Sequence, residues 1–254
     1  MVLDFYASAA VLVVFVVAFL ATYAAIPPSA SLMKRRGIFG TDAHKLDSAK
    51  IPEMCGVSVI VGLCVAGLVS AGLLADHFRE IAAFLGTLLI AGAIGAIDDL
   101  RPLSSKLKPV LTGLAALPIL LLGTYDPKPF LPLVGTARLT ILYPLLVPIA
   151  IAVSANAVNM LDVFNGSMSG TLTIVSLALA LVLALSGNST ATSLALALAG
   201  SLLAFYLFNR YPARVFWGDT GTLAVGAAVG ALSVIGRIEV VTIVALAPYI
   251  MNAF

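Results

Sequence analysis

The sequence predicts an all-α polytopic membrane protein with about nine transmembrane helices. Hydrophobic residues make up 61% of the 254 residues. Charged residues make up only 10%, whereas soluble globular domains carry about 25%. A chain this poor in charge cannot cover itself with groups that water solvates, so its main solvent must be lipid. The net charge of +2 is too small to indicate a nucleic-acid partner.

Long apolar runs separated by short polar stretches place the helices along the chain. No strand-like alternation of polar and apolar residues competes with them. A helix needs about 20 apolar residues to cross hydrocarbon, so the third, fourth and eighth runs are short for a complete span. The expected helices cover residues 5–26, 54–75, 81–97, 109–124, 141–158, 168–186, 191–208, 221–235 and 240–254.

The first run has the charge pattern of a membrane span. Asp4 precedes it, and Lys34, Arg35 and Arg36 follow it. A cleaved signal peptide instead carries its positive charge before the apolar stretch. We therefore expect this run to remain in the protein.

Basic residues predict the orientation, because cytoplasmic loops carry an excess of Lys and Arg. Of the 14 basic residues, four lie in one set of alternate loops: Arg79, Lys128, Arg138 and Arg237. The other set holds Lys34, Arg35, Arg36, Lys45, Lys50, Arg101, Lys106, Lys108, Arg210 and Arg214. This bias places the N-terminus outside and the richer loops in the cytoplasm, at the plasma membrane in a prokaryote. The richer loops are also the longer and more polar ones, so we expect the functional site on the cytoplasmic side.

Asp98 and Asp99 end the third apolar run. Two adjacent carboxylates at a membrane boundary repel one another unless a cation lies beside them. A divalent metal or a lysine would supply that cation, and Lys106 and Lys108 follow closely. An acidic end also opposes the helix dipole, which favours a functional role over a chance helix end.

The segment 156–166 carries Asn156, Asn159, Asp162 and Asn165, one polar side chain every three residues. This spacing brings them together on a last helical turn and the loop after it. Amide and carboxylate oxygens suit hard cations such as Mg²⁺. Asn and Gly also form ordinary turns, so this segment alone does not distinguish a cation site from a turn.

A third cluster, Phe216-Trp217-Gly218-Asp219-Thr220-Gly221, opens the eighth run. Its glycines allow the backbone to approach a phosphate, and a helix N-terminus favours anions. Asp219 could instead simply cap the helix. The expected common membrane depth of Asp98, Asp99 and Asn159 favours the functional interpretation.

Four motifs now stand in order: Ile51-Pro52-Glu53, Asp98-Asp99, Asn156-Ala157-Val158-Asn159 and Gly218-Asp219-Thr220. Their order and spacing resemble those of the polyprenyl-phosphate N-acetylhexosamine-1-phosphate transferases. That superfamily includes the bacterial phospho-MurNAc-pentapeptide translocase and the archaeal and eukaryotic UDP-GlcNAc:dolichyl-phosphate transferases. The resemblance covers about residues 31–254.

The resemblance implies a role for each motif residue. Asp98, Asp99 and Lys108 would be catalytic, with Lys108 meeting the lipid phosphate. Asp219 and Asn159 would hold Mg²⁺, with Mn²⁺ as an alternative ion. Asn165 would contact the uracil, and Glu53 and Asp42 the nucleotide-sugar. The remaining substrate-binding residues would be Asn156, in the segment 152–160 beside the lipid phosphate, Asp162 and Lys106.

Two features favour the dolichol-type branch of the superfamily. Ile51-Pro52-Glu53 resembles that branch, and Asn165 stands where the bacterial translocase has Asp. Asp162, however, resembles the bacterial pattern. We expect one transmembrane catalytic domain over residues 1–254, with its C-terminal part missing, because family members continue through a His/Arg-bearing loop to a tenth helix.

The implied reaction transfers a HexNAc-1-phosphate, GlcNAc-1-phosphate in the dolichol-type branch, from a UDP-sugar to a polyprenyl or dolichyl phosphate. UMP would be released in this first membrane step of glycan assembly. The resemblance leaves a homodimer open. One alternative is the bacterial-type translocase acting on UDP-MurNAc-pentapeptide. A second is a secondary transporter, but transporter sites lie near the membrane midplane, whereas these acids lie at a boundary.

Overall fold

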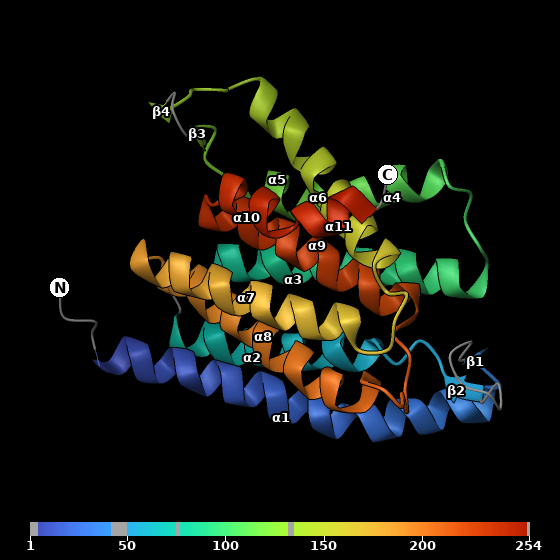
Figure 1. Cartoon of the computed structure of the whole chain (residues 1–254). Helices are drawn as coiled ribbons and strands as arrows, with labels where there is room; N and C mark the ends of the chain where they lie inside the picture. Colours follow the sequence, from blue (N-terminus) through green and yellow to red (C-terminus); the bar gives the residue numbers. More distant parts are fainter. Residues whose placement is uncertain (1–4, 42–49, 75–76, 132–134, 253–254) are drawn as a thin grey trace.

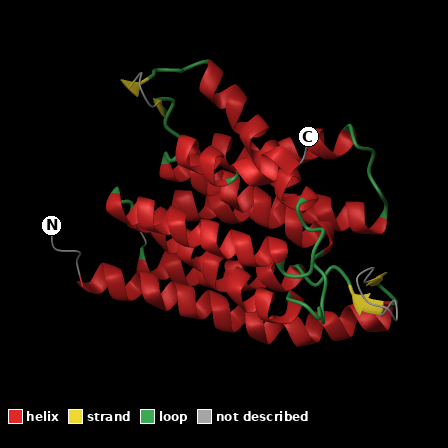
Figure 2. Ribbon diagram, in the orientation of Figure 1, coloured by secondary structure: helices red, strands yellow, loops and turns green. Residues whose placement is uncertain are grey.

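A computed structural model describes residues 5–41, 50–74, 77–131 and 135–252. Helices form most of this part of the chain (Figure 2). The longest are α1 (Phe5–Arg36), α2 (Val57–Leu73), α3 (Phe78–Leu100), α6 (Leu142–Met160), α7 (Ser167–Leu185), α8 (Ser189–Asn209) and α9 (Gly218–Gly236). Shorter pieces are α4 (Leu107–Gly113), η2 (Leu114–Ala116), α5 (Leu117–Leu122), α10 (Glu239–Ala245) and α11 (Ala247–Asn252).

Each of the nine apolar runs contains a helix. Among the described residues, six helices, α1, α3, α6, α7, α8 and α9, are long and apolar enough to cross a membrane. The apolar helices Val57–Leu73 and Leu107–Leu122 are shorter. The ninth run is divided between α10 and α11. The predicted all-α polytopic fold is confirmed, and the protein is an integral membrane protein.

Helix α1 ends at Arg36, ten residues beyond its predicted end. The predicted run ended at residue 26, just before Pro27 and Pro28, and both prolines lie inside the helix. The extension stays packed because Met33 is buried against the core. Tertiary packing here outweighs the helix-breaking tendency of proline.

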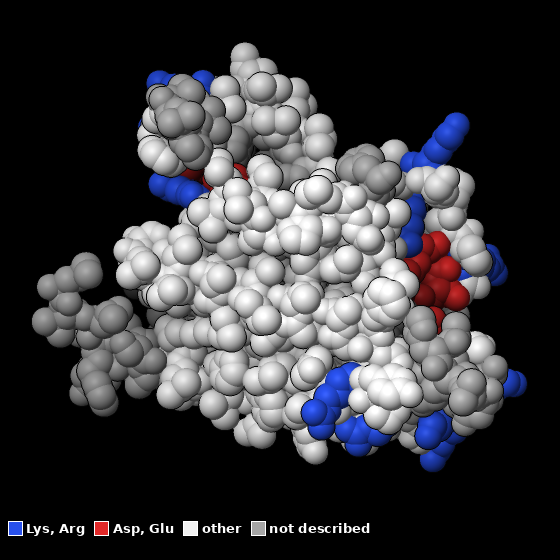
Figure 3. Space-filling model, viewed as in Figure 1, with Lys and Arg blue, Asp and Glu red and all other residues white. Residues whose placement is uncertain are grey.

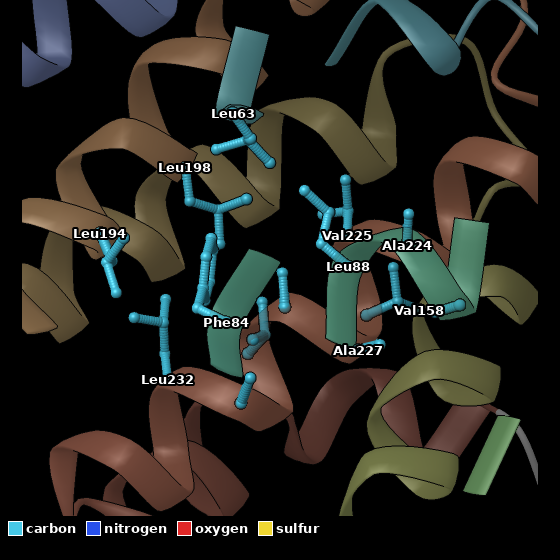
Figure 4. Close-up of a cluster of buried hydrophobic side chains, with 14 of the residues drawn as sticks. Leu63, Phe84, Leu88, Val158, Leu194, Leu198, Ala224, Val225, Ala227 and Leu232 are labelled. Carbon is cyan, nitrogen blue, oxygen red and sulfur yellow. The ribbon is translucent and has the colours of Figure 1, made fainter. Parts of the chain in front are cut away.

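Helix α9 lies at the centre of the bundle. It packs against α3 and α6, and 89% of the residues in its most apolar stretch are buried. Its many Gly and Ala residues allow neighbouring helix backbones to approach closely, as in other membrane bundles. Figure 4 shows the resulting core, in which Leu88 of α3 lies near Val225 of α9, and Phe84 of α3 lies near Leu232 of α9.

The helices run back and forth between two ends of the molecule (Figure 1). One carries strands β1 (Phe39–Thr41) and β2 (Lys50–Pro52), and is called the β1–β2 end. The other carries β3 (Phe130–Leu131) and β4 (Gly135–Thr136), and is called the β3–β4 end. On the face in Figure 3, charged side chains lie at these two ends, with an uncharged belt between them. This is the pattern expected of a chain that crosses a membrane.

Short strands, which the sequence pattern did not indicate, organise the β1–β2 end. β1 and β2 pair antiparallel, with Phe39 opposite Pro52. The last residue of β2 and the chain just after it bond to the segment before α9. Phe216 N donates to Pro52 O at 2.9 Å, and Cys55 N donates to Phe216 O at 3.0 Å. Runs of two or three residues are too short to produce visible alternation. This pairing brings Glu53 next to the start of α9.

Two polar contacts hold the β3–β4 end together. One joins the segment before β3 to the end of α9, and the other joins the start of α6 to the start of α10. Arg237 forms an ion pair with Asp126 at 3.0 Å. The Tyr143 hydroxyl donates to the Glu239 carboxylate. These groups lie at the opposite end of the bundle from the three polar motifs of α3, α6 and α9.

Candidate active site

Four helices each bring one polar side chain to a common point at the β1–β2 end. The Lys108 ammonium, from α4, lies 2.7 Å from Asp98 Oδ2 at the end of α3. It also lies 2.7 Å from Asp219 Oδ2, at the start of α9, and 3.1 Å from Asn159 Oδ1 on α6. Two carboxylates and one amide oxygen therefore converge on a single positive charge.

Asn159 is held in one orientation by its amide nitrogen. Its Nδ2 donates to Asp219 Oδ1 at 2.6 Å and to Thr222 Oγ1 at 2.7 Å. These bonds turn its Oδ1 toward Lys108. One oxygen of Asn159 and one oxygen of Asp219 thus face the same ammonium group.

Asp98 and Asp99 face different partners although they are adjacent. Asp98 is 7% exposed and accepts a hydrogen bond from Leu103 N at 2.5 Å as well as the Lys108 contact. Asp99 accepts hydrogen bonds from Asp219 N at 2.7 Å, Thr220 N at 2.8 Å and Thr220 Oγ1 at 2.6 Å. Asp98 belongs to the lysine cluster, whereas Asp99 holds the beginning of α9.

Two pockets open on either side of Asp219 and share that residue and Glu53. The first has a volume of about 330 Å³ and the second about 520 Å³. The first is lined by Gly40, Thr41, Glu53, Asn159, Asp162, Val163, Phe164, Asn165, Asn209, Phe216, Gly218, Asp219 and Thr222. The second is lined by Ile38, Glu53, Met54, Asp98, Asp99, Pro102, Leu103, Ser105, Lys108 and Asp219.

Two further acids in the first pocket lie in loops between the helices. Burial, together with the nearby carboxylates of Asp219 and Glu53, raises the pKa of Asp162 to about 7. Burial also raises the pKa of Glu53, and the carboxylates of Asp99 and Asp219 raise it further. The cluster therefore holds more acids than Lys108 can balance, and an added cation would stabilise it.

The structure places the other predicted residues as follows. Asn165 lies in the first pocket, on the turn after α6. Asn156 donates to Thr112 Oγ1 at 2.9 Å and to Ala152 O at 2.8 Å, so it ties α6 to α4. Lys106 is exposed just before α4. Asp42 lies outside the described residues. Their predicted roles in binding substrate remain predictions.

Sequence reasoning missed Asn209, which is 2% exposed at the end of α8. Its Oδ1 accepts from Gly166 N at 3.2 Å and Ser169 Oγ at 3.1 Å, and its Nδ2 donates to Val215 O at 3.1 Å. It thereby joins the two loops that form the first pocket. No local pattern marks it, because a single Asn at a helix end is common.

The residues present fit a magnesium ion. Within the described residues, no group of three or more His, Cys, Asp or Glu side chains could hold a metal. Mg²⁺, however, is usually bound through one or two carboxylates together with substrate phosphates. Asp219, which lines both pockets, and Asn159, which lines the first, would supply oxygen ligands. Water would complete the coordination in the free protein, and a substrate phosphate would replace some of that water when bound.

These features define a polytopic membrane protein with a carboxylate and lysine cluster at one end of its helices. Residues 81–237 match the family model of glycosyl transferase family 4. The chain belongs to this family, as its motifs predicted.

Relatives agree with this assignment. The chain is 34% identical to a glycosyltransferase of Methanocaldococcus jannaschii, over 85% of this chain and 65% of the relative. It is 31% identical to a Sulfolobus acidocaldarius protein named UDP-N-acetylglucosamine–dolichyl-phosphate N-acetylglucosaminephosphotransferase, over 87% of this chain and 70% of the relative. It is 30% identical to a phospho-N-acetylmuramoyl-pentapeptide-transferase of Acetivibrio thermocellus, over 80% of this chain and 64% of the relative. The chain thus spans about two thirds of the length of these curated relatives.

Proposed function

We propose that the protein transfers GlcNAc-1-phosphate from UDP-GlcNAc to a polyprenyl or dolichyl phosphate and releases UMP. The observation that carries this proposal is the Lys108 ammonium held between Asp98 and Asp219, where two pockets meet. Two anionic substrates that must react with one another need such a shared cationic point. The name of the Sulfolobus acidocaldarius relative supports the same substrates.

The first pocket suits the nucleotide-sugar. Its volume of about 330 Å³ falls within the usual range for small-molecule sites. Phe216 offers a flat apolar face, and Asn165 offers an amide that can pair with a uracil edge. Asp219 lies where the pocket reaches the lysine cluster, which is where the diphosphate would lie.

The second pocket suits the phosphate of the lipid acceptor. It is lined by Lys108 and Asp98 at the β1–β2 end, where a membrane lipid would present its head group. In the reaction an acceptor phosphate oxygen forms a bond to the β-phosphorus of the UDP-sugar. The bond from that phosphorus to the bridging oxygen breaks, and UMP leaves with the electron pair.

Electrostatics supply most of the catalysis in this proposal. Lys108 would attract the acceptor phosphate and reduce the repulsion between the two anions. The second pKa of a phosphate monoester is about 6, so the acceptor is largely dianionic at neutral pH and needs little help from a base. When bound by Asp219 and Asn159, Mg²⁺ would neutralise charge on the transferring phosphoryl group.

The uneven distribution of basic residues supports an orientation with the β1–β2 end in the cytoplasm and the N-terminus outside. A cytoplasmic site would have direct access to a soluble nucleotide-sugar. The polar clusters of α3, α6 and α9 all lie at that end.

A second candidate is the bacterial-type translocase that acts on UDP-MurNAc-pentapeptide. Asp162 in the first pocket favours it, and so does the likeness to the Acetivibrio thermocellus protein. Asn165 and the Pro52-Glu53 pair favour the dolichol-type reaction. The choice is tested by giving purified full-length protein either UDP-sugar together with a polyprenyl phosphate. If UMP is released with UDP-GlcNAc but not with UDP-MurNAc-pentapeptide, the first candidate is supported. If UMP is released with UDP-MurNAc-pentapeptide but not with UDP-GlcNAc, the second candidate replaces the first.

A further inference from the structure

The start of α9 is capped from another helix. The first N–H groups of a helix have no partner within it and need acceptors from elsewhere. Trp217, the residue before α9, provides no side-chain cap. Asp99, 120 residues earlier, accepts from Asp219 N, and its other oxygen accepts from both Thr220 N and Thr220 Oγ1.

Close packing locks this arrangement. A Cβ at Gly95 would lie 2.2 Å from the Asp219 carbonyl oxygen, so the α3 backbone rests directly against the first turn of α9. Gly218 has φ +64°, and a Cβ there would lie 2.8 Å from Asp99 Oδ2. Only glycine at both positions allows the carboxylate to reach the helix end.

Asp98 and Asp99 are therefore not equivalent. Both oxygens of Asp99 are engaged by α9, and none of these bonds involves Lys108. Asp98 turns its Oδ2 to the Lys108 ammonium at 2.7 Å. Of the two, Asp98 is the acid placed beside the group that would attract the acceptor phosphate.

We infer that Asp99 is a positioning residue: it fixes the first turn of α9 so that the Asp219 carboxylate is presented to a divalent cation. This inference rests on the proposed function for its meaning in the reaction. Its structural content, that Asp99 sets the cation affinity of Asp219 through hydrogen bonds, is separate from the identity of the substrates.

Two rival explanations make different predictions. If Asp99 is the catalytic base, Asp99→Asn should abolish turnover at any metal concentration without changing metal affinity. If Asp99 only adds negative charge near the metal, Thr220→Val should change nothing, because it leaves every charge in place. Positioning predicts that Thr220→Val weakens metal binding, since it removes one of the three bonds to Asp99.

The experiment measures Mn²⁺ binding to purified full-length protein by electron paramagnetic resonance, without substrates. We expect Asp99→Ala to weaken Mn²⁺ binding at least about tenfold, the usual effect of leaving buried polar groups unpaired. Thr220→Val should weaken it by about two- to tenfold, the value of one hydrogen bond. The double variant should be no weaker than Asp99→Ala, because both changes remove the same interaction.

A second measurement covers the possibility that Asp99→Ala folds poorly. Hydrogen exchange at the amides of Asp219 and Thr220 should be faster in Thr220→Val, while exchange in the middle of α9 stays as in the wild type. Asp99→Asn keeps one acceptor oxygen, so it should retain turnover at saturating Mg²⁺ and need more Mg²⁺ to reach it.

Three results would overturn the inference: no Mn²⁺ binding by wild-type protein, unchanged Mn²⁺ binding in Thr220→Val, or loss of turnover in Asp99→Asn with Mn²⁺ affinity intact. Failure of the proposed function has a different signature. The Mn²⁺ and exchange results would then follow the expected pattern, while wild-type protein released no UMP from UDP-GlcNAc.

Discussion

The Lys108 ammonium lies 2.7 Å from the Asp219 carboxylate, although 111 residues separate them in the chain. One comes from the short helix α4 and the other from the first turn of the buried helix α9. The contact joins two elements that both pack against α6. It also marks the boundary between the two pockets, because Lys108 lines only the second and Asp219 lines both.

Removing the charge of Lys108 should slow turnover. Lys108→Gln should lower kcat about 100-fold or more, the usual cost of losing a group that stabilises developing charge. Arg101→Gln is the matched control, since Arg101 is exposed at the same end of the bundle and lines neither pocket. Steady-state kinetics with saturating substrates would check this. Equal kcat values in the two variants would remove Lys108 from the reaction.

The Mg²⁺ requirement of the reaction should depend on the Asp219 carboxylate. Asp219→Asn should raise the Mg²⁺ concentration for half-maximal activity at least about tenfold, because one charged ligand is lost. Asp126→Asn is the control, because Asp126 pairs with Arg237 at the β3–β4 end. A Mg²⁺ titration of initial rates distinguishes them. An Asp219→Asn protein with the wild-type Mg²⁺ response would show that the ion is held elsewhere.

Asn165 should affect the nucleotide-sugar alone. Loss of one hydrogen bond to an uncharged base costs about 0.5–1.5 kcal/mol, so Asn165→Ala should raise the KM for UDP-GlcNAc about two- to tenfold. The KM for the lipid phosphate should stay near the wild-type value, because Asn165 lines only the first pocket. Varying each substrate in turn gives both constants. A larger change on the lipid side would reject the uracil role.

Affinity for the nucleotide-sugar should fall as the pH rises through about 7. Burial, with the carboxylates of Asp219 and Glu53, raises the pKa of Asp162 to about 7. Below that pH Asp162 is protonated and neutral; above it, its negative charge repels a nucleotide diphosphate in the same pocket. The KM for UDP-GlcNAc should therefore rise with pH, and Asp162→Asn should abolish the rise. The same pH profile in both proteins would assign the titration to another group.

The orientation of the protein in the membrane can be determined with single introduced cysteines, after Cys55 and Cys64 are replaced. Ser104 is exposed at the β1–β2 end, and Ser186 is exposed at the turn between α7 and α8, at the other end. In sealed right-side-out vesicles, a membrane-impermeant thiol reagent should label Ser186→Cys and leave Ser104→Cys unlabelled until the vesicles are opened. Labelling of Ser104→Cys alone before opening would reverse the orientation.

Much of the fold was readable from the sequence because hydrophobicity along the chain sets where membrane helices form. The family could also be predicted from the sequence, because each of its motifs is short and lies within one continuous stretch of the chain. The end of α1 was missed because the continuous apolar run stops at residue 26, whereas the helix goes on to Arg36 with Met33 buried. Packing of this kind has no local signature.

The internal organisation of the site needed the structure. Spacing brought Asn156 and Asn159 into one candidate cluster, yet Asn156 bonds to Thr112, whereas Asn159 meets Asp219. The different partners of Asp98 and Asp99 could not be foreseen either. Each depends on contacts between residues far apart in the chain, which one sequence does not reveal.

The most direct test of the proposed reaction is to follow the β-phosphate. Purified full-length protein is given UDP-GlcNAc radiolabelled in that phosphate, together with a short-chain polyprenyl phosphate and Mg²⁺. Transfer of GlcNAc-1-phosphate predicts that the label moves into the lipid extract in equal amount with the UMP formed. If the sugar reaches the lipid while the label stays in water-soluble UDP, the protein transfers a sugar without its phosphate, and the proposed chemistry at Lys108 and Asp219 is wrong.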